Sequence, residues 1–273
     1  MTTIGQKERA TQNRVVALFR QRLGYTYLGN WEDRPNNRNV EETLLRAYLV
    51  ERQVKEPLVN KALYELTKVA GDQSQSLYDV NKAVYSLLRY GVKVKAEVGE
   101  NTETVWLIDW QNPLNNHFAV AEEVTISGQH TKRPDIVLYV NGIALGVLEL
   151  KRSIVSVSEG IRQNLDNQKK EFIERFFSTV QFIMAGNDTQ GLRYGALKTP
   201  EKYYLEWKEE NPDYHPGDKS TEKYLSNSAC TDGESSLDCA LLRLCEKSRF
   251  IEFIHNFVVF GYRHNRRLVN GIG

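Results

Sequence analysis

The chain has 273 residues, with 36 Lys or Arg against 35 Asp or Glu, so its formal net charge is +1. The length suits one large domain or two small ones, and a hydrophobic content of 41% excludes a chain that is disordered throughout. No apolar run approaches the roughly 20 residues that a bilayer span needs, and the first residues lack the apolar core of a signal peptide. We therefore expect a cytoplasmic protein without membrane contact.

The cysteines are odd in number and form no C-x-x-C pair: Cys230, Cys239 and Cys245. This arrangement predicts no disulfide framework and gives little support to a zinc site. It fits a reducing compartment, in which all three side chains would be buried as small hydrophobic residues.

The first third of the chain has the apolar spacing of helices. Helices are predicted over residues 6–23, after Asn39 as an N-cap, from Pro57 as a first helical position, and over residues 77–90. Residues 29–38 read as a polar loop. The N-terminal part of the fold is therefore expected to be a helical layer.

After residue 91, the spacing of apolar residues changes from the period of helices to the period of strands. Alternation or buried apolar runs predict strands over residues 92–98, 105–110, 118–126, 134–140, 143–151, 179–185, 192–196 and 203–207. Asn141-Gly142 between two of them is a strong hairpin signal. Trp106 and Trp110 fall on one face of the second strand, where core or edge packing is expected.

A further helix is predicted over residues 158–177, and two closing helices over 237–246 and 250–260, after an exposed loop at 208–236. The order predicts an α/β fold of α+β-like layout: a mixed sheet of about five strands flanked by helices. The expected division is a domain over residues 1–207, the loop, closing helices of the same domain, and a tail or cut linker at 261–273.

The segment from Arg133 to Arg152 contains the charged residues that are candidates for catalysis. Glu149 and Lys151 are two apart at the end of an apolar strand, so both project from one face. A carboxylate and an ammonium at this place either pair with each other or serve a site. Both interpretations stay open on these residues alone.

Hairpin register decides whether Asp135 can join them. In a regular two-residue hairpin, Asp135 pairs with Leu148 and faces away from Glu149. A bulge, such as one formed by Gly142 in a three-residue loop, brings Asp135 to the face of Glu149. A shared site for the two carboxylates therefore requires a bulge or bend in this hairpin.

Two carboxylates and a nearby lysine suit Mg²⁺, which prefers a few hard oxygen ligands and keeps several waters. Such a cation polarises a phosphodiester and activates a water, while Lys151 can position the water or stabilise charge on the phosphate. Basic residues lie on both sides of the site in the sequence, and Lys132, Arg133 and Arg152 are the candidates for DNA phosphate contacts.

Pro134-Asp135, followed after thirteen residues by Glu149-Leu150-Lys151, resembles the PD-(D/E)xK nuclease motif. The wider chain resembles the N-terminal endonuclease region of the restriction (R) subunit of type I restriction–modification enzymes. The resemblance covers roughly residues 6–260 and is carried by residues 8–29, 133–152 and 181–196.

The resemblance implies a PD-(D/E)xK-type fold with Asp135 and Glu149 as metal ligands and Lys151 as the catalytic lysine. It also implies a further acidic ligand on the first helix, where Glu8 falls with Gln12 one turn on. The family has a DNA-contacting Q-x-x-x-Y motif on the helix after the lysine. Gln163 matches the glutamine, whereas Asn167 stands at the tyrosine position.

The implied function is Mg²⁺-dependent cleavage of double-stranded DNA together with methyltransferase and specificity subunits. R subunits use ATP through a motor region. This sequence contains no phosphate-binding motif G-x-x-x-x-G-K-[ST], and Gly217-Asp218-Lys219-Ser220 does not match it. We therefore expect that the chain binds no ATP and that it is a fragment or a truncated product. Alone, it should be a slow, sequence-blind and salt-sensitive nuclease. The alternatives are a stand-alone repair nuclease and a catalytically silent DNA-binding or assembly module that docks onto methyltransferase subunits.

Overall fold

The computed structural model describes residues 3–207, 230, 233–261 and 269–272. The helices are α1 (Thr3–Gln21), α2 (Glu42–Glu51), α3 (Glu56–Ala70), α4 (Leu77–Tyr90), α5 (Val157–Asn167), α7 (Ser236–Leu244) and α8 (Lys247–Phe257). Short 3-10 helices are η1 (Pro113–Asn115), η2 (Glu174–Ser178) and η3 (Glu201–Tyr203).

The strands are β1 (Thr26–Asn30), β2 (Val92–Val94), β3 (Glu103–Val105), β4 (Phe118–Glu122), β5 (Ile136–Val140), β6 (Ile143–Leu150), β7 (Phe182–Asn187), β8 (Gly191–Gly195), β9 (Val258–Gly261) and β10 (Val269–Ile272). Six of them form one mixed sheet in the order β1-β4-β5-β6-β7-β8. The β1–β4 and β6–β7 pairs are parallel and the other pairs antiparallel. The expected helix-flanked mixed sheet is confirmed, with six strands instead of about five.

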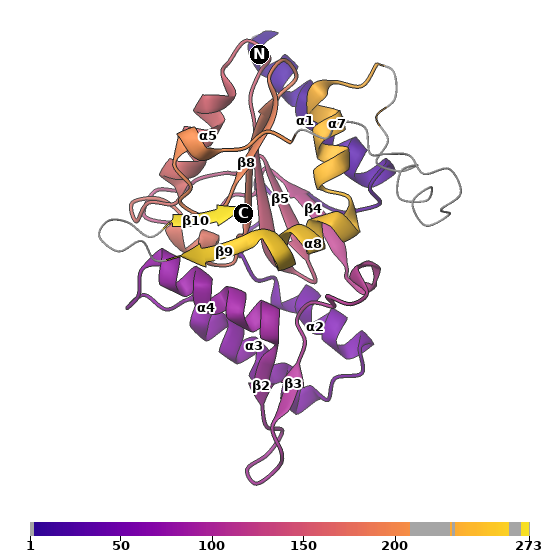
Figure 1. The fold of residues 1–273 in the computed structure, drawn as a ribbon, viewed down its shortest axis with the longest axis vertical. Coiled ribbons are helices and arrows are strands. Elements are labelled where there is room, and N and C mark those ends of the chain that lie inside the picture. Colours follow the sequence, from indigo (N-terminus) through magenta and orange to yellow (C-terminus); the bar gives the residue numbers. More distant parts are fainter. Residues whose placement is uncertain (1–2, 208–229, 231–232, 262–268, 273) are drawn as a thin grey trace.

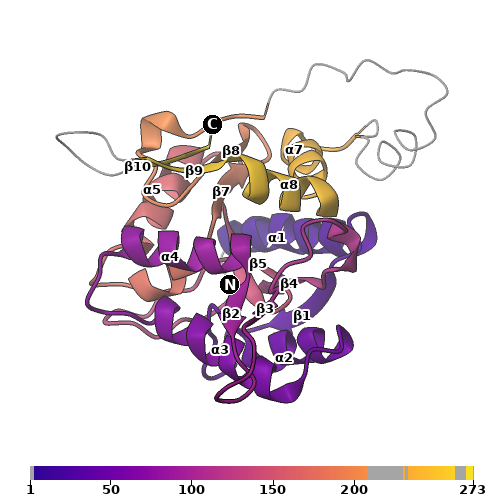
Figure 2. The same cartoon turned by 60° about the horizontal axis from the view of Figure 1, so that its bottom comes forward.

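Helices cover both faces of this sheet. The crossover helix α5 packs on β6 and β7, whereas α1 and α7 lie together on the opposite side (Figure 1). Helices α2 to α4 and the β2–β3 ribbon form a separate layer beyond one end of the strands (Figure 2). The two ends of the β5–β6 hairpin therefore differ: its turn faces the helical layer, and its open end lies free of that layer.

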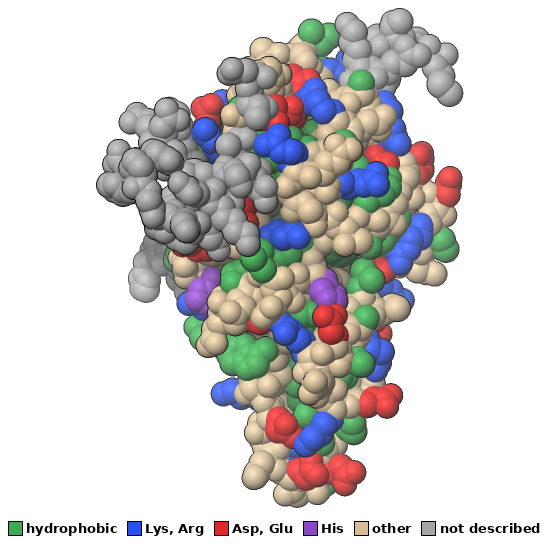
Figure 3. Space-filling view, turned by 90° about the vertical axis from the view of Figure 1, so that its right-hand side faces the viewer, with side chains coloured by type: hydrophobic (Ala, Val, Ile, Leu, Met, Phe, Trp, Pro, Cys, Tyr) green, Lys and Arg blue, Asp and Glu red, His purple; other side chains and the backbone are tan. Residues whose placement is uncertain are grey.

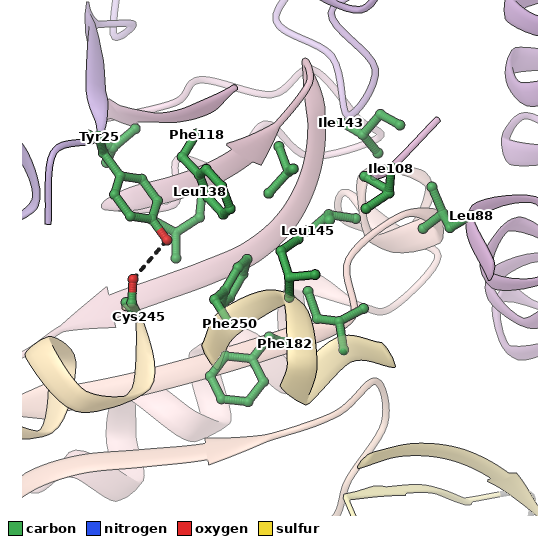
Figure 4. Packing of buried hydrophobic residues seen from close by; sticks show 14 of the residues in the cluster. Tyr25, Leu88, Ile108, Phe118, Leu138, Ile143, Leu145, Phe182, Cys245 and Phe250 are labelled. Carbon is green, nitrogen blue, oxygen red and sulfur yellow. Dashed lines mark hydrogen bonds between the residues drawn. The ribbon is translucent and has the colours of Figure 1, made fainter. Parts of the chain in front are cut away.

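The main core lies between the sheet and the helices on the α1 side. Phe182 packs edge-on against Phe250 of α8, with ring centroids 5.9 Å apart (Figure 4). The Tyr25 hydroxyl donates a 2.9 Å hydrogen bond to the carbonyl of Cys245, which fixes the end of α7 to the segment after α1. Leu241 and Leu244 of α7 and Phe250 and Ile254 of α8 are fully buried, so the closing helices belong to this core, although Phe257 at the end of α8 is exposed.

Replacing Phe250 by alanine is expected to destabilise the protein by about 3–5 kcal/mol, since the ring is fully buried and its removal leaves a cavity. Urea unfolding followed by circular dichroism measures the change. Phe257→Ala is the control, because that ring lies on the same helix but is 38% exposed. Equally small losses for the two variants would show that α8 contributes little to the core.

Long-range pairing overrides two of the predicted elements. Asn39 does not cap α2, because its side-chain amide donates to Ser178 Oγ at 2.8 Å and the next residue, Val40, forms a β-bridge to β6. Helix α2 begins at Glu42. The predicted helix over 158–177 breaks at Gln168, whose side-chain oxygen accepts a bond from the Lys198 amide at 2.7 Å.

The strand predicted over 105–110 is mostly wrong. β3 ends at Val105, and the following chain turns so that the Asp109 amide bonds to the Asn116 side chain at 2.9 Å. Trp106, expected to pack, is 51% exposed. The sequence also missed the edge strand β1, which pairs with β4.

One of the cysteine predictions is wrong. Cys230 and Cys239, which lies in the first turn of α7, are joined as a disulfide with their Cα atoms 5.1 Å apart. Only Cys245 is a free, buried thiol among the described residues. No helix in the described part of the chain is both long and apolar enough to cross a membrane.

Candidate active site

The β5–β6 hairpin contains the bulge that a shared carboxylate site requires. Its turn is the regular two-residue type, with positive φ at both Asn141 (52°) and Gly142 (83°). The bulge lies farther along, where Leu145 of β6 has no partner in β5, and it shifts the register so that Ile136 pairs with Leu148. If this register is extended by one residue beyond the Ile136–Leu148 pair, Asp135 lies opposite Glu149. The required bulge is thus confirmed, but its predicted location at Gly142 is wrong.

Gly142 is needed at the turn for space as well as for its backbone angle. A Cβ there would lie 2.7 Å from Leu44 Cβ and 2.8 Å from the Glu41 carbonyl oxygen, both in or beside α2. The helical layer therefore packs directly on the hairpin turn and fixes the strands whose far ends carry the acids.

Asp135, Glu149 and Lys151 come together at the open end of the hairpin. The Lys151 ammonium donates to Glu149 Oε1 at 3.0 Å, while Asp135 Oδ2 accepts a 2.6 Å bond from the Leu150 amide. Glu149 is 1% exposed, and its buried Oε2 has no hydrogen-bond donor among the described residues. A buried carboxylate oxygen without a donor next to a second carboxylate fits a cation ligand.

The electrostatics of Glu149 follow from this arrangement. Burial raises the pKa of its carboxyl well above the ordinary range, the neighbouring Asp135 raises that pKa further, and Lys151 lowers it. The single nearby ammonium therefore offsets only part of the cost of holding two carboxylates together. A divalent cation would supply the remaining positive charge.

Gly160 allows α5 to lie directly over the site. A Cβ on it would lie 3.1 Å from Ala185 Cβ, 3.4 Å from Lys151 Cγ and 3.6 Å from Glu149 Cγ. One turn later, Gln163 Oε1 accepts a 2.7 Å hydrogen bond from the Lys151 ammonium. The close helix packing thus places a second acceptor on the lysine, which the sequence did not predict.

Replacing Gly160 by valine is expected to destabilise the protein by about 1–3 kcal/mol, because the added carbons overpack a filled contact with β6 and β7. Glu159→Val, at an exposed position of the same helix, controls for the helix propensity of valine. Urea unfolding compares the two. If both variants unfold alike, the close packing of α5 contributes little.

The basic candidates for DNA contact differ in their surroundings. Arg133 forms ion pairs with Glu32 and, at 2.7 Å, with Glu123, so its charge is already offset. The Lys132 ammonium lies 4.2 Å from the Phe172 ring centroid. Arg152 is half-buried and has no side-chain partner in the described part of the chain. The role of these residues at phosphates stays a prediction.

Helix α1 carries Glu8, whose side chain is not among the described ones, and Gln12 one turn on. Gln12 is buried and donates to Glu122 Oε2 at 2.9 Å. The same carboxylate accepts a 2.6 Å bond from the Tyr27 hydroxyl. Glu122 lies on the sheet face toward α1, whereas Glu149 lies on the face toward α5, so Gln12 meets a different acid from the predicted pair.

Sequence reasoning missed Glu122 and its neighbour Glu123, two acids at the end of β4. The Glu123 amide donates to the Asp135 carbonyl oxygen at 2.8 Å, so Glu123 borders the candidate site, whereas Glu122 lies on the opposite face of the sheet. The signal available was an acidic pair directly after the buried run of β4. Asn167, at the position of the family's tyrosine, is 1% exposed, and its side-chain amide has no partner among the described residues.

A family model described as "Type I restriction enzyme R protein N terminus" matches residues 5–202. The chain belongs to this family. The match contains every element of the candidate site, from α1 through the β5–β6 hairpin to α5.

Curated relatives are endonuclease subunits of type I restriction enzymes. The chain is 26% identical over 186 residues to the putative MjaIXP endonuclease subunit of Methanocaldococcus jannaschii, covering 65% of this chain and 18% of that protein. It is 29% identical over 189 residues to the HindI endonuclease subunit of Haemophilus influenzae, covering 66% and 16%. The chain thus spans less than a fifth of the length of these two relatives.

Proposed function

We propose that this chain is a Mg²⁺-dependent endonuclease unit that hydrolyses phosphodiester bonds of double-stranded DNA. The observation that carries the proposal is the state of Glu149: its carboxylate is buried, one oxygen is bound by Lys151, and the other has no donor among the described residues beside Asp135. The family assignment supports the same chemistry, because the relatives are named endonuclease subunits.

In this proposal, Asp135 and Glu149 hold the cation. A divalent cation bound there supplies Lewis-acid activation of the scissile phosphate. The Leu150 amide, at 2.6 Å from Asp135 Oδ2, fixes the orientation of that carboxylate, so the pair is arranged before the cation arrives.

Lys151 provides the positive charge of the protein at the reacting phosphate. Its ammonium is held by Glu149 Oε1 and Gln163 Oε1 and is mostly shielded from solvent, which strengthens its interaction with an anion. Gln163 therefore positions the lysine, in addition to any contact that it makes with DNA.

We further propose that the unit works within a restriction–modification complex, beside methyltransferase and specificity subunits. The relatives' names support this setting. On the side of the molecule drawn in Figure 3, basic and acidic side chains are interspersed rather than gathered into one broad basic face. Delivery of DNA by other subunits, or by an ATP-driven motor region, would compensate for weak, salt-sensitive binding by this chain.

Incubation of the purified chain with supercoiled plasmid tests the proposal. We expect slow nicking with Mg²⁺ or Mn²⁺, none with EDTA, and a rate that falls as salt rises from about 50 to 200 mM. Glu149→Gln should abolish nicking and retain DNA binding in a gel-shift assay. Asp166→Gln is the control, since that exposed acid lies on α5 and pairs only with Lys169 among the described residues.

Three outcomes would contradict the proposal. DNA binding without cleavage under any divalent cation would favour a silent binding or assembly module. Rapid, site-specific fragments without partner subunits would favour a stand-alone nuclease, and equal cleavage by Glu149→Gln would place the chemistry elsewhere.

A further inference from the structure

One cavity lined by described residues lies far from the candidate active site. It measures about 690 Å³ and opens between α2, the segment after β3, and α8. Its wall is tied to the turn of the β5–β6 hairpin, because the Asn141 amide donates to the Leu107 carbonyl at 2.9 Å. Glu149 lies at the opposite end of β6, whose eight residues span roughly 23 Å. The cavity and the acid pair are separate sites.

Aromatic rings form one part of the cavity lining. Trp106 is 51% exposed at a position where the sequence predicted packing. Trp110 is fixed: its indole N–H donates to the Leu88 carbonyl at 2.9 Å, and its ring lies 4.9 Å from that of His255. One ring is thus held rigidly and the other is open to solvent, an arrangement that can bind a flat ring by stacking.

Positive charge forms another part of the lining. Arg52, at the end of α2, pairs with Asp109 at 3.0 Å and lies over the Tyr48 ring at 5.7 Å. Arg89 of α4 donates to the His255 carbonyl and so joins α4 to α8. Two guanidinium groups against one carboxylate leave the lining with a net positive charge. On the face in Figure 3, hydrophobic, basic, acidic and histidine side chains are mixed at mid-height.

We infer that this cavity binds an unpaired nucleotide, with the base stacked on the exposed tryptophan and the phosphate near the two arginines. Aromatic platforms beside cationic groups are the arrangement that captures bases of single strands, because every base offers a π-face and every linkage a negative charge. The volume lies within the range of small-ligand sites. Two further cavities, of about 270 and 390 Å³, have no tryptophan in their lining.

The shared chemistry is a base with its phosphate, which either a free nucleotide or an unpaired position in a DNA strand can supply. The inference does not depend on the proposed nuclease function. Binding is therefore measured with EDTA present, where a metal-dependent cleavage site is inactive. A fluorescently labelled twelve-residue oligothymidylate is titrated with the full chain, and fluorescence anisotropy gives the Kd.

Trp106→Ala and Arg52→Gln are expected to raise this Kd at least about fivefold, the lower end of the effect of losing one base–aromatic stack. Tyr64→Ala and Lys68→Gln are matched controls. Tyr64 is 61% exposed, and Lys68 lies over its ring at 5.8 Å with an ion pair to Glu65, but neither lines a described cavity. The controls should change the Kd by less than about twofold.

Competition separates the two sources of the ligand. Displacement of the labelled strand by thymidine monophosphate supports a free nucleotide, and displacement only by unlabelled oligothymidylate supports an unpaired strand. No measurable binding, equal Kd values in cavity and control variants, or equal displacement by a duplex of the same length would overturn the inference.

Discussion

Replacing Lys151 by methionine is expected to lower plasmid cleavage about 100-fold or more while metal binding is retained. Methionine keeps most of the stem that packs near Gly160 but removes the ammonium from the candidate site. Loss of one group that stabilises charge in the transition state typically costs 10²–10³ in rate. Metal affinity should stay the same or rise, because the ammonium no longer competes for Glu149 Oε1.

Lys169→Met is the matched control for this loss. Lys169 pairs with Asp166 at 2.6 Å, as Lys151 pairs with Glu149, but it is exposed and lies at the end of α5, away from the acids. Cleavage assays and Mn²⁺ titration calorimetry on both variants separate catalysis from binding. Substantial cleavage by Lys151→Met would remove the lysine from the chemistry.

The second large effect is expected from Asp135→Asn, which should weaken Mg²⁺ or Mn²⁺ binding roughly tenfold or more, about 1.4 kcal/mol. The change removes one of two anionic oxygen ligands, and affinity at such sites depends on ligand charge. The amide oxygen of asparagine can still accept the bond from the Leu150 amide, so local geometry is preserved.

A stability measurement distinguishes this effect from misfolding. Without metal, Asp135→Asn should unfold at the same temperature as the unmodified chain or higher, because the change removes a carboxylate that raises the pKa of Glu149. Asp166→Asn is the control for calorimetry. Unchanged metal affinity in Asp135→Asn would reject a site shared by the two carboxylates.

Local sequence signals predicted the parts of the fold that depend on near neighbours. Asn141-Gly142 formed the expected turn because both positions need positive φ, a short-range property. The bulge at Leu145 could not be located in this way, since it depends on how β6 packs between its neighbours. The failed cap at Asn39 has the same origin: pairing with β6 and η2 replaced a local preference.

The same distinction between local sequence signals and long-range packing applies to the candidate site. The spacing of Asp135, Glu149 and Lys151 is a sequence pattern and could be read directly. The bond between Gln163 and Lys151 depends on the close approach of α5 at Gly160, which no local pattern specifies. Glu122 accepts a hydrogen bond from Gln12, which lies 110 residues earlier in the chain. The burial of Glu122 could therefore be seen only in the folded structure.

Crystals of the chain soaked with Mn²⁺ test the central claim most directly, since anomalous scattering locates the ion. The account predicts one strong peak between the carboxylates of Asp135 and Glu149, absent from crystals of Asp135→Asn grown and soaked in the same way. No peak at this edge of the sheet, or a peak held by Glu122 or Glu123 instead, would contradict the assignment of the metal site.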